Sequence, residues 1–195
     1  MKLQVIVGST RPNRVTPRLA KWVAEEATHL LDTVVEVVDL ADYPLPFLDE
    51  AVSPQYNPDR KPDTVTRKWL DKLAEADAYV LATPEYNRSY PAVLKNALDY
   101  IDFQFQQKPV AIAAHGSTGG AQAVAHLRGV ISGLLAVTVP KATYMVGGVR
   151  DKLDEDGRAN DELKSNPYGP QAALKAMLED TKWYSDALVA ARAKK

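Results

Sequence analysis

The chain has 195 residues, of which 46% are hydrophobic and 25% are charged, and its net charge is −1. This balance is typical of a globular protein with a sizeable core, and the scattered lysines and arginines argue against a nucleic-acid surface. The chain has no cysteine, which excludes disulfides, thiolate metal sites and a cysteine nucleophile, so that any redox chemistry depends on a bound cofactor.

Strand-like and helix-like segments alternate along the chain. Short apolar runs predict buried strands at residues 3–7, 34–38, 78–82, 110–114 and 143–146. Apolar residues at helical spacing predict helices at residues 17–31, 65–76, 91–101 and 124–135, and a C-terminal helix at about 170–192. This alternation predicts an α/β fold, with a parallel sheet covered by helices on both faces, in a single domain of residues 1–195.

Two stretches interrupt the alternation. Prolines punctuate a long excursion at residues 43–62, which either has a function or wraps the surface. Residues 149–170 are polar and charged, and we expect a surface loop there. Their Asp154-Glu155-Asp156-Gly157 suggests calcium, but EF-hand spacing places Lys152 at the first ligand position, so we expect no metal site.

A first loop, Gly8-Ser9-Thr10-Arg11-Pro12-Asn13-Arg14, joins the first strand to the first helix. Gly8 permits a tight turn, and the following helix presents its positive amino end. Hydroxyls, backbone N–H groups and two guanidinium groups complete a cradle for phosphate. The alternative is a turn with surface arginines. The loop lacks the Gly-Lys-Ser/Thr of a Walker motif and the further glycines of a dinucleotide fingerprint.

Two more loops follow the third and fourth strands. Residues 83–91 contain Pro84, Pro91 and two tyrosines, which suit a rigid loop beside a planar ring or a plain surface loop. His115-Gly116-Ser117-Thr118-Gly119-Gly120 is rich in glycine, which permits close approach of a ligand or merely a tight turn. In a sheet of order 2-1-3-4-5, the loops after strands one, three and four meet at one site. A phosphate on the first loop and a flat ring against the others fit FMN.

The three motifs resemble those of the NAD(P)H-dependent FMN reductases, a family with a flavodoxin-like fold that includes quinone, azo-dye and chromate reductases. Residues 84–91, followed by Leu94-Lys95-Asn96-Ala97-Leu98-Asp99, are similar to its most specific motif. Asn13 stands where many members have glycine, and His115 where many have tyrosine. The resemblance covers roughly residues 1–147.

This resemblance implies a three-layer flavodoxin-like fold, with a five-stranded parallel sheet of order 2-1-3-4-5, and FMN as the cofactor. It implies three groups of FMN-binding residues: Ser9, Thr10, Arg11, Asn13, Arg14 and Val15 at the phosphate; Pro84, Glu85, Tyr86 and Asn87 along the ring, mainly through backbone N–H groups; and His115, Gly116, Ser117 and Gly119 at its pyrimidine side. NADPH or NADH is the implied co-substrate. Hydride passes to N5 of the flavin, so no side chain is expected to be catalytic.

The resemblance also implies a homodimer or homotetramer and a small-molecule electron acceptor, such as a quinone, azo compound, free flavin or metal oxyanion. Gly129 and Gly133 suit close contact with a second subunit or ordinary packing within the chain. Residues 43–48 either cover a neighbour's flavin or close over their own core. No apolar run is long enough for a signal peptide or a membrane span, so we expect a cytoplasmic protein without membrane partners.

Two alternatives remain at this point. A flavodoxin-type electron carrier would bind FMN without turning over NAD(P)H, but the net charge of −1 and the arginines of the first loop suit it poorly. A flavin-binding regulatory protein would keep the same fold. Lys95 and Asp99 are one helical turn apart and are expected to form an ion pair on a helix face rather than to act in catalysis.

Overall fold

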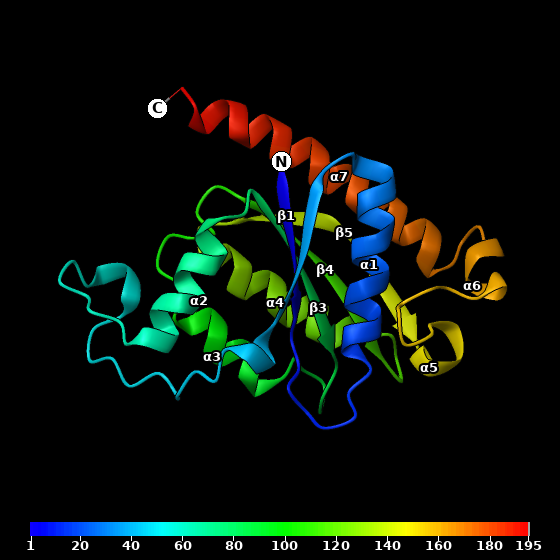
Figure 1. Cartoon of the computed structure of the whole chain (residues 1–195), viewed down its shortest axis with the longest axis horizontal. Coiled ribbons are helices and arrows are strands. Elements are labelled where there is room, and N and C mark those ends of the chain that lie inside the picture. Colours follow the sequence, from blue (N-terminus) through cyan, green and yellow to red (C-terminus); the bar gives the residue numbers. More distant parts are fainter. Residues whose placement is uncertain (195) are drawn as a thin grey trace.

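One parallel sheet organises the molecule (Figure 1). The computed structural model describes residues 1–194, and Lys195, the last residue of the expected domain, lies outside them. The strands are β1 (Lys2–Val7), β2 (Val34–Asp39), β3 (Ala78–Pro84), β4 (Pro109–Gly116) and β5 (Val137–Val146). They pair in parallel in the order β2-β1-β3-β4-β5, which confirms the predicted flavodoxin-like topology.

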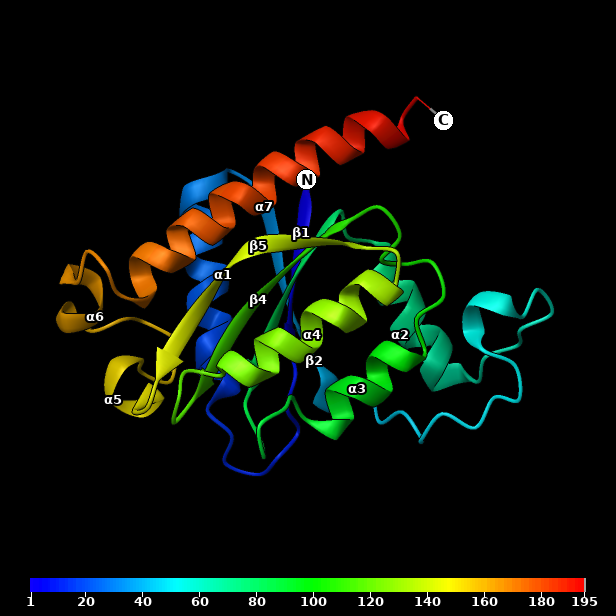
Figure 2. The ribbon, with the colours of Figure 1, turned by 180° about the vertical axis from the view of Figure 1, so that it is seen from behind.

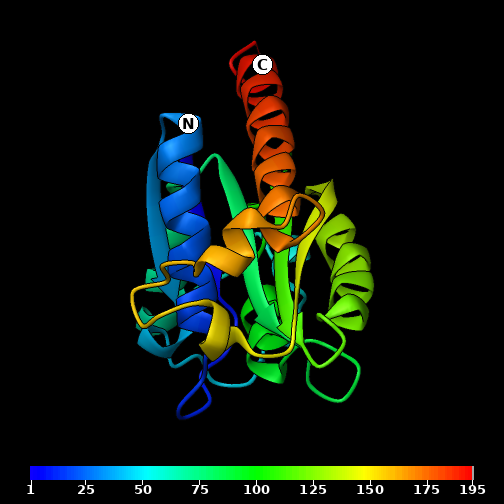
Figure 3. The ribbon, with the colours of Figure 1, turned by 90° about the vertical axis from the view of Figure 1, so that its right-hand side faces the viewer.

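Helices cover both faces of this sheet. The principal helices are α1 (Thr16–Leu31), α2 (Thr64–Ala74), α3 (Ala92–Asp99), α4 (Ala121–Gly133) and α7 (Pro170–Arg192), and α5 (Val149–Lys152) and α6 (Asp161–Ser165) are short. Figures 2 and 3 show α1 and α7 on one face and α3 and α4 on the other, where α2 also packs. Within residues 1–194, none of the helices combines the length and the apolar character needed to cross a membrane.

Each face of the sheet has its own core, and a tryptophan is buried in each. Trp22 of α1 is 1% exposed and Trp69 of α2 is 0% exposed. Their indole N–H groups donate to Gln171 Oε1 at 3.0 Å and to the carbonyl oxygen of Ala97 at 2.9 Å. Burial of a large apolar side chain contributes about 1.5–3 kcal/mol, and the hydrogen bonds remove the penalty for burying the indole N–H. The two cores therefore hold the sheet rigidly between the helices.

Strand β5 begins six residues before the predicted start, and α4 ends two residues before the predicted end, at Gly133. Leu135 has a φ of 60°, a left-handed conformation that helices exclude. Pro140 and Lys141 disguised the strand in the sequence. Proline is tolerated here because β5 lies at the edge of the sheet and its pairing with β4 shifts register nearby.

The expectation of a plain surface loop at residues 149–170 was wrong. The segment contains α5 and α6, and it buries four apolar side chains between charged ones: Val149, Leu153, Ala159 and Leu163. These side chains join the core beneath α1 and α7. Its polar composition concealed them because only one residue in several points inward.

The excursion at residues 43–62 closes over its own core. Tyr43 is buried, and its ring centroid lies 5.2 Å from that of Trp69. The Asn96 amide fastens the segment to α3, since its Oδ1 accepts from the Leu48 N–H at 3.0 Å and its Nδ2 donates to the Pro46 carbonyl at 2.7 Å. Phe47 is 82% exposed, and Pro44 and Pro46 beside it are also exposed. The buried side chains of this segment therefore pack on their own subunit, and contact of the segment with a neighbour's flavin stays a prediction.

Candidate functional site

The three loops of interest meet at the carboxyl edge of the sheet, at the lower side of Figure 1. We call residues 8–15 loop 1, residues 84–91 loop 2 and residues 115–120 loop 3. The Ser9 and Tyr86 hydroxyls are 3.0 Å apart, which joins loops 1 and 2. The Glu85 N–H donates to the His115 carbonyl at 2.9 Å, which joins loops 2 and 3. The predicted site residues therefore form one connected surface.

Loop 1 leaves a set of backbone donors open at the amino end of α1. Within the described residues, the main-chain N–H groups of five positions donate no hydrogen bond: Ser9, Thr10, Arg11, Asn13 and Val15. Open N–H groups beside a positive helix end are the donor set that phosphate requires. Asn13 has a φ of 55°, a conformation that glycine and asparagine adopt most readily. This explains why asparagine can replace glycine there.

The two arginines of loop 1 are in different environments. Arg14 Nη2 lies 2.5 Å from Asp39 Oδ2, at the end of β2, and both side chains are largely buried. Nothing in the described part of the chain accepts a hydrogen bond from the buried Arg14 Nε. Arg11 is exposed, and its Cζ lies 5.5 Å from the centroid of the Tyr86 ring. Arg11 thus keeps its full charge, whereas that of Arg14 is balanced by Asp39.

Loop 2 is a tight hairpin that uses most of its own donors. Tyr86 and Ser89 exchange main-chain hydrogen bonds of 2.8 and 3.0 Å. Asn87 and Arg88 between them have φ values of 49° and 68°, as in a type I′ turn. Because the N–H groups of Glu85 and Tyr86 are engaged, only those of Asn87 and Arg88 remain open among these four positions. Of these four residues, only Asn87 and Arg88 at the tip therefore have backbone N–H groups open for the predicted contact with the ring. Pro84 is buried at the end of β3.

His115 is a buried link between loop 3 and α1. Its Nε2 is 3.0 Å from Thr16 Oγ1, and its exposed fraction is 8%. Burial lowers the pKa of the imidazole to about 4, so the ring is neutral near pH 7. A neutral ring does not add a charge to the site, but it fixes the first turn of α1 relative to β4.

The rest of loop 3 is held by Glu85 and by two glycines. The Glu85 carboxylate accepts from the Gln122 N–H at 2.9 Å and so caps the amino end of α4. Gly119 and Gly120 have φ values of 77° and 87°. A Cβ on Gly120 would lie 2.6 Å from the Ala114 Cβ, so glycine is required there. Gly116 and Ser117 flank this turn, and Ser117 is exposed.

Several residues around the site were not found by sequence reasoning. Asp39 follows the second strand at the same edge of the sheet, and its position was a usable signal. Arg150 of α5 donates from Nη2 to the carbonyl of Asn13 at 2.8 Å. No sequence pattern indicates this contact, because it depends on how residues 149–170 fold. The predicted ion pair on α3 is confirmed, with Lys95 Nζ 2.6 Å from Asp99 Oδ1.

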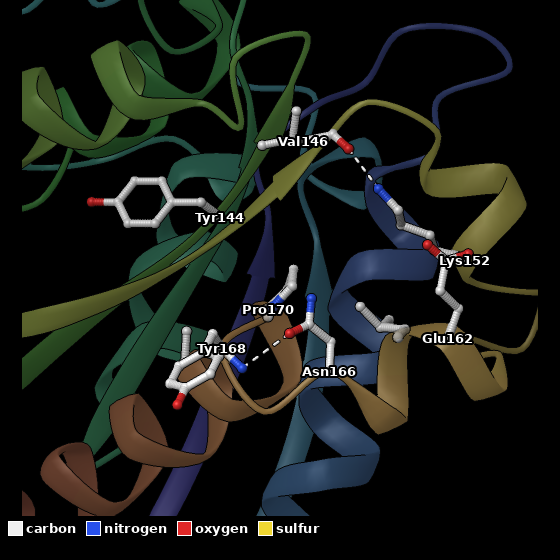
Figure 4. Close-up of a pocket in the computed structure, with 10 residues that line it drawn as sticks. Tyr144, Val146, Lys152, Glu162, Asn166, Tyr168 and Pro170 are labelled. Carbon is white, nitrogen blue, oxygen red and sulfur yellow. Dashed lines mark hydrogen bonds between the residues drawn. The ribbon is translucent and has the colours of Figure 1, made fainter.

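A separate cavity of about 420 Å³ lies outside β5 (Figure 4). It is lined by Tyr144, Val146, Lys152, Glu162, Leu163, Asn166, Tyr168, Gly169, Pro170 and Ala173. Lys152 Nζ donates to the Val146 carbonyl at 2.6 Å, and Asn166 Oδ1 accepts from the Tyr168 N–H at 3.0 Å. The cavity contains no predicted site residue, and two of its polar groups are already paired. Loops 1–3 therefore remain the candidate site.

The comparison with known families agrees with this geometry. The sequence profile of the family described as NADPH-dependent FMN reductase matches residues 1–151. The chain belongs to this family. The predicted family, the NAD(P)H-dependent oxidoreductase activity and the use of FMN are thereby confirmed.

Other FMN reductases support the assignment. An NAD(P)H-dependent FMN reductase of Schizosaccharomyces pombe is 38% identical over 170 residues, which cover 84% of this chain and 85% of that protein. An FMN-dependent NADPH-azoreductase of Staphylococcus haemolyticus is 36% identical over 161 residues, with coverage of 80% and 82%. The solved structure of FerB, an NAD(P)H:(acceptor) oxidoreductase of Paracoccus denitrificans, has a TM-score of 0.68 at 23% identity. It covers 95% of this chain and 97% of its own and shows the shared fold.

Proposed function

We propose that loop 1 holds the phosphate of FMN. The observation that carries this proposal is the set of open N–H groups at the amino end of α1. The Ser9 and Thr10 hydroxyls and the Arg11 guanidinium add donors beside them. Arg14, oriented by Asp39, has a buried Nε without an acceptor in residues 1–194, and a phosphate oxygen would satisfy it.

The flavin ring would then lie between loops 2 and 3. The open N–H groups of Asn87 and Arg88, and those of Ser117 and Thr118, are suited to the oxygen and nitrogen atoms of its polar edge. Three further predicted residues support the loops without reaching the ring: Pro84 ends β3, Glu85 caps α4 and Val15 leads into α1.

The chain itself then binds, orients and shields, rather than reacting. The chemistry supplied by bound FMN is hydride acceptance from NAD(P)H and electron donation to a second substrate. His115 is neutral and adds no positive charge beside the ring, while Arg11 and the amino end of α1 supply positive charge at the phosphate end. We therefore assign no catalytic side chain.

We propose a small-molecule acceptor, such as a quinone, an azo compound, a free flavin or a metal oxyanion. The tips of loops 2 and 3 are exposed at Asn87, Arg88, Ser117 and Thr118, which gives access to acceptors of different shapes. The azoreductase of Staphylococcus haemolyticus, a relative of this chain, is named for one such acceptor class.

We further propose a single cytoplasmic domain that forms a homodimer or homotetramer. NAD(P)H as the reductant favours the cytoplasm. A Cβ on Gly129 or Gly133 would have no neighbour within 4 Å in the described residues, so packing within the chain does not explain these glycines. Close contact with a second subunit would explain them, and exposed Phe47 offers apolar surface for such contact.

The decisive test is an anaerobic visible spectrum of the purified full-length protein, recorded before and after addition of NADPH. We expect a flavin spectrum that bleaches with NADPH and returns with a quinone. A flavin spectrum that persists with both NADPH and NADH would contradict the reductase function. Absence of flavin binding, even with added FMN, would contradict the assignment of the three loops.

The phosphate assignment is tested separately with Arg11→Ala. We expect an FMN dissociation constant about 10- to 100-fold higher, because a hydrogen bond to a charged group contributes about 1.5–3 kcal/mol. The circular dichroism spectrum should not change, since Arg11 is exposed. An unchanged FMN affinity would remove Arg11 from the phosphate site.

A further inference from the structure

The segment after β5 is seated on the first turns of α1, and we call its residues 149–160 the strap (Figure 3). Arg18 Nη1 donates to the Leu153 carbonyl at 3.0 Å, and Lys21 Nζ donates to the Glu155 carbonyl at 2.8 Å. Gly157 has a φ of 86°, and a Cβ there would lie 2.6 Å from the backbone nitrogen of Trp22. The strap thus lies directly against the α1 backbone.

The strap is also fixed internally. Leu153 and Ala159 form an antiparallel bridge, and both side chains are buried. Asp154 Oδ1 accepts the N–H groups of Asp156 at 2.9 Å and Arg158 at 2.8 Å. A segment with buried side chains and satisfied backbone groups holds a defined position, and so can present a side chain reliably.

Arg150 is the side chain that the strap brings to loop 1. Its Nη2 donates to the Asn13 carbonyl at 2.8 Å. This bond uses one of the five N–H donors of the guanidinium, and Arg150 has no carboxylate partner among residues 1–194. The group therefore brings an unbalanced positive charge and free donors to the tip of the loop.

The charge of Arg150 matters because that of Arg14 is already balanced. Asp39 holds Arg14, with 2.5 Å between Nη2 and Oδ2. A phosphate monoester carries up to two negative charges, and Arg11 supplies one free positive charge in the loop. Arg150 supplies a second from outside it.

We propose that Arg150 completes the phosphate site by fixing the tip of loop 1 and adding a charge that selects phosphate-bearing flavin over riboflavin. This inference rests on the proposed role of loop 1 and adds Arg150, which lies at the end of the family match at residues 1–151, whereas most of the strap lies beyond that match. The ligand chemistry is a phosphate monoester. FMN carries one at its 5′ position and NADPH carries one at its 2′ position, and we assign Arg150 to that of FMN.

The test is a titration of flavin-free, full-length protein with FMN and with riboflavin, followed by quenching of flavin fluorescence. Arg150→Gln should raise the FMN dissociation constant about 10-fold and leave that of riboflavin unchanged. Arg150→Lys should lie between, because it keeps the charge but loses the planar fork. Arg158→Gln is the matched control, since Arg158 lies on the same strap and pairs with Asp156 at 3.1 Å.

Three results would overturn the inference. An Arg150→Gln variant with the FMN affinity of the native protein excludes Arg150 from the site. An equal loss of affinity for FMN and riboflavin means that Arg150 only holds the loop. A rise in the KM for NADPH but not for NADH, with FMN affinity unchanged, would mean that Arg150 binds the 2′-phosphate of NADPH instead. A native protein that binds no FMN would instead contradict the proposed function itself.

Discussion

The two edges of the sheet differ in how their polar groups find partners. At the amino edge, charged side chains satisfy one another: Lys2 and Lys72 both pair with Glu36 and Glu75, and Asp77 accepts the Lys2 N–H at 2.9 Å. At the carboxyl edge, loop 1 leaves five N–H groups without an intramolecular acceptor in residues 1–194. The first edge closes the fold, and the second leaves hydrogen-bonding capacity for a ligand.

Backbone conformation does not distinguish the two edges. Asn13, Asn87 and Arg88 have positive φ values at the carboxyl edge, and Asp32, Gln107 and Leu135 have them at the amino edge. The difference between the edges therefore lies in their unpaired hydrogen-bond donors and not in backbone strain.

The largest effect on the free energy of unfolding should come from adding a Cβ at Gly120, at the carboxyl edge. Gly120→Ala should lower the free energy of unfolding by about 3 kcal/mol, because it combines a φ of 87° with overlap on Ala114. Urea unfolding measures the change, and a Gly120→Ala variant as stable as the native protein would contradict the expected overlap.

A second effect is a pH dependence that distinguishes the two edges. The pKa of His115 is about 4 in the folded protein against 6.5 for an ordinary histidine. Between these pH values, His115 binds a proton in the unfolded chain but not in the folded one. The free energy of unfolding therefore falls by up to about 3 kcal/mol as the pH drops from about 6.5 to about 4.

His115→Gln should reduce this loss, because glutamine does not take up a proton and can still bond Thr16. Urea unfolding at pH 7 and pH 4.5 measures the difference. Burial raises the pKa of Glu36, but bonds from Lys72 and Lys2 outweigh it and leave the pKa below 4.5. Its contribution is therefore lost only at lower pH. Equal acid sensitivity of the native protein and the His115 variant would contradict the assignment.

The smallest effect is expected at the amino edge. Glu36→Gln removes a carboxylate from a network whose side chains are a quarter to two-fifths exposed. We expect a loss below about 1 kcal/mol, reduced further in high salt by screening. The FMN dissociation constant should stay unchanged, because the network lies at the opposite edge. A change in FMN affinity would show that the two edges are coupled.

Much of the architecture follows from local sequence. Buried apolar runs predicted four strands nearly in full, and the order of the strands placed the three candidate loops at one edge. The prediction for β5 was too short, because Pro140 and Lys141 are not typical of a strand. The position of Asp39 at the end of the second strand was a usable signal. The Arg150–Asn13 contact was out of reach, because it joins residues 137 positions apart and depends on how residues 149–170 fold.

The cap that Glu85 places on α4 has a consequence for the direction in which a ligand docks. Helices α1 and α4 begin directly after loops 1 and 3 at the same edge, and each amino end attracts negative charge. The carboxylate of Glu85 already occupies the amino end of α4. Of these two helix ends, an elongated molecule with one anionic end therefore finds only that of α1 open, which favours binding with its anionic end on loop 1.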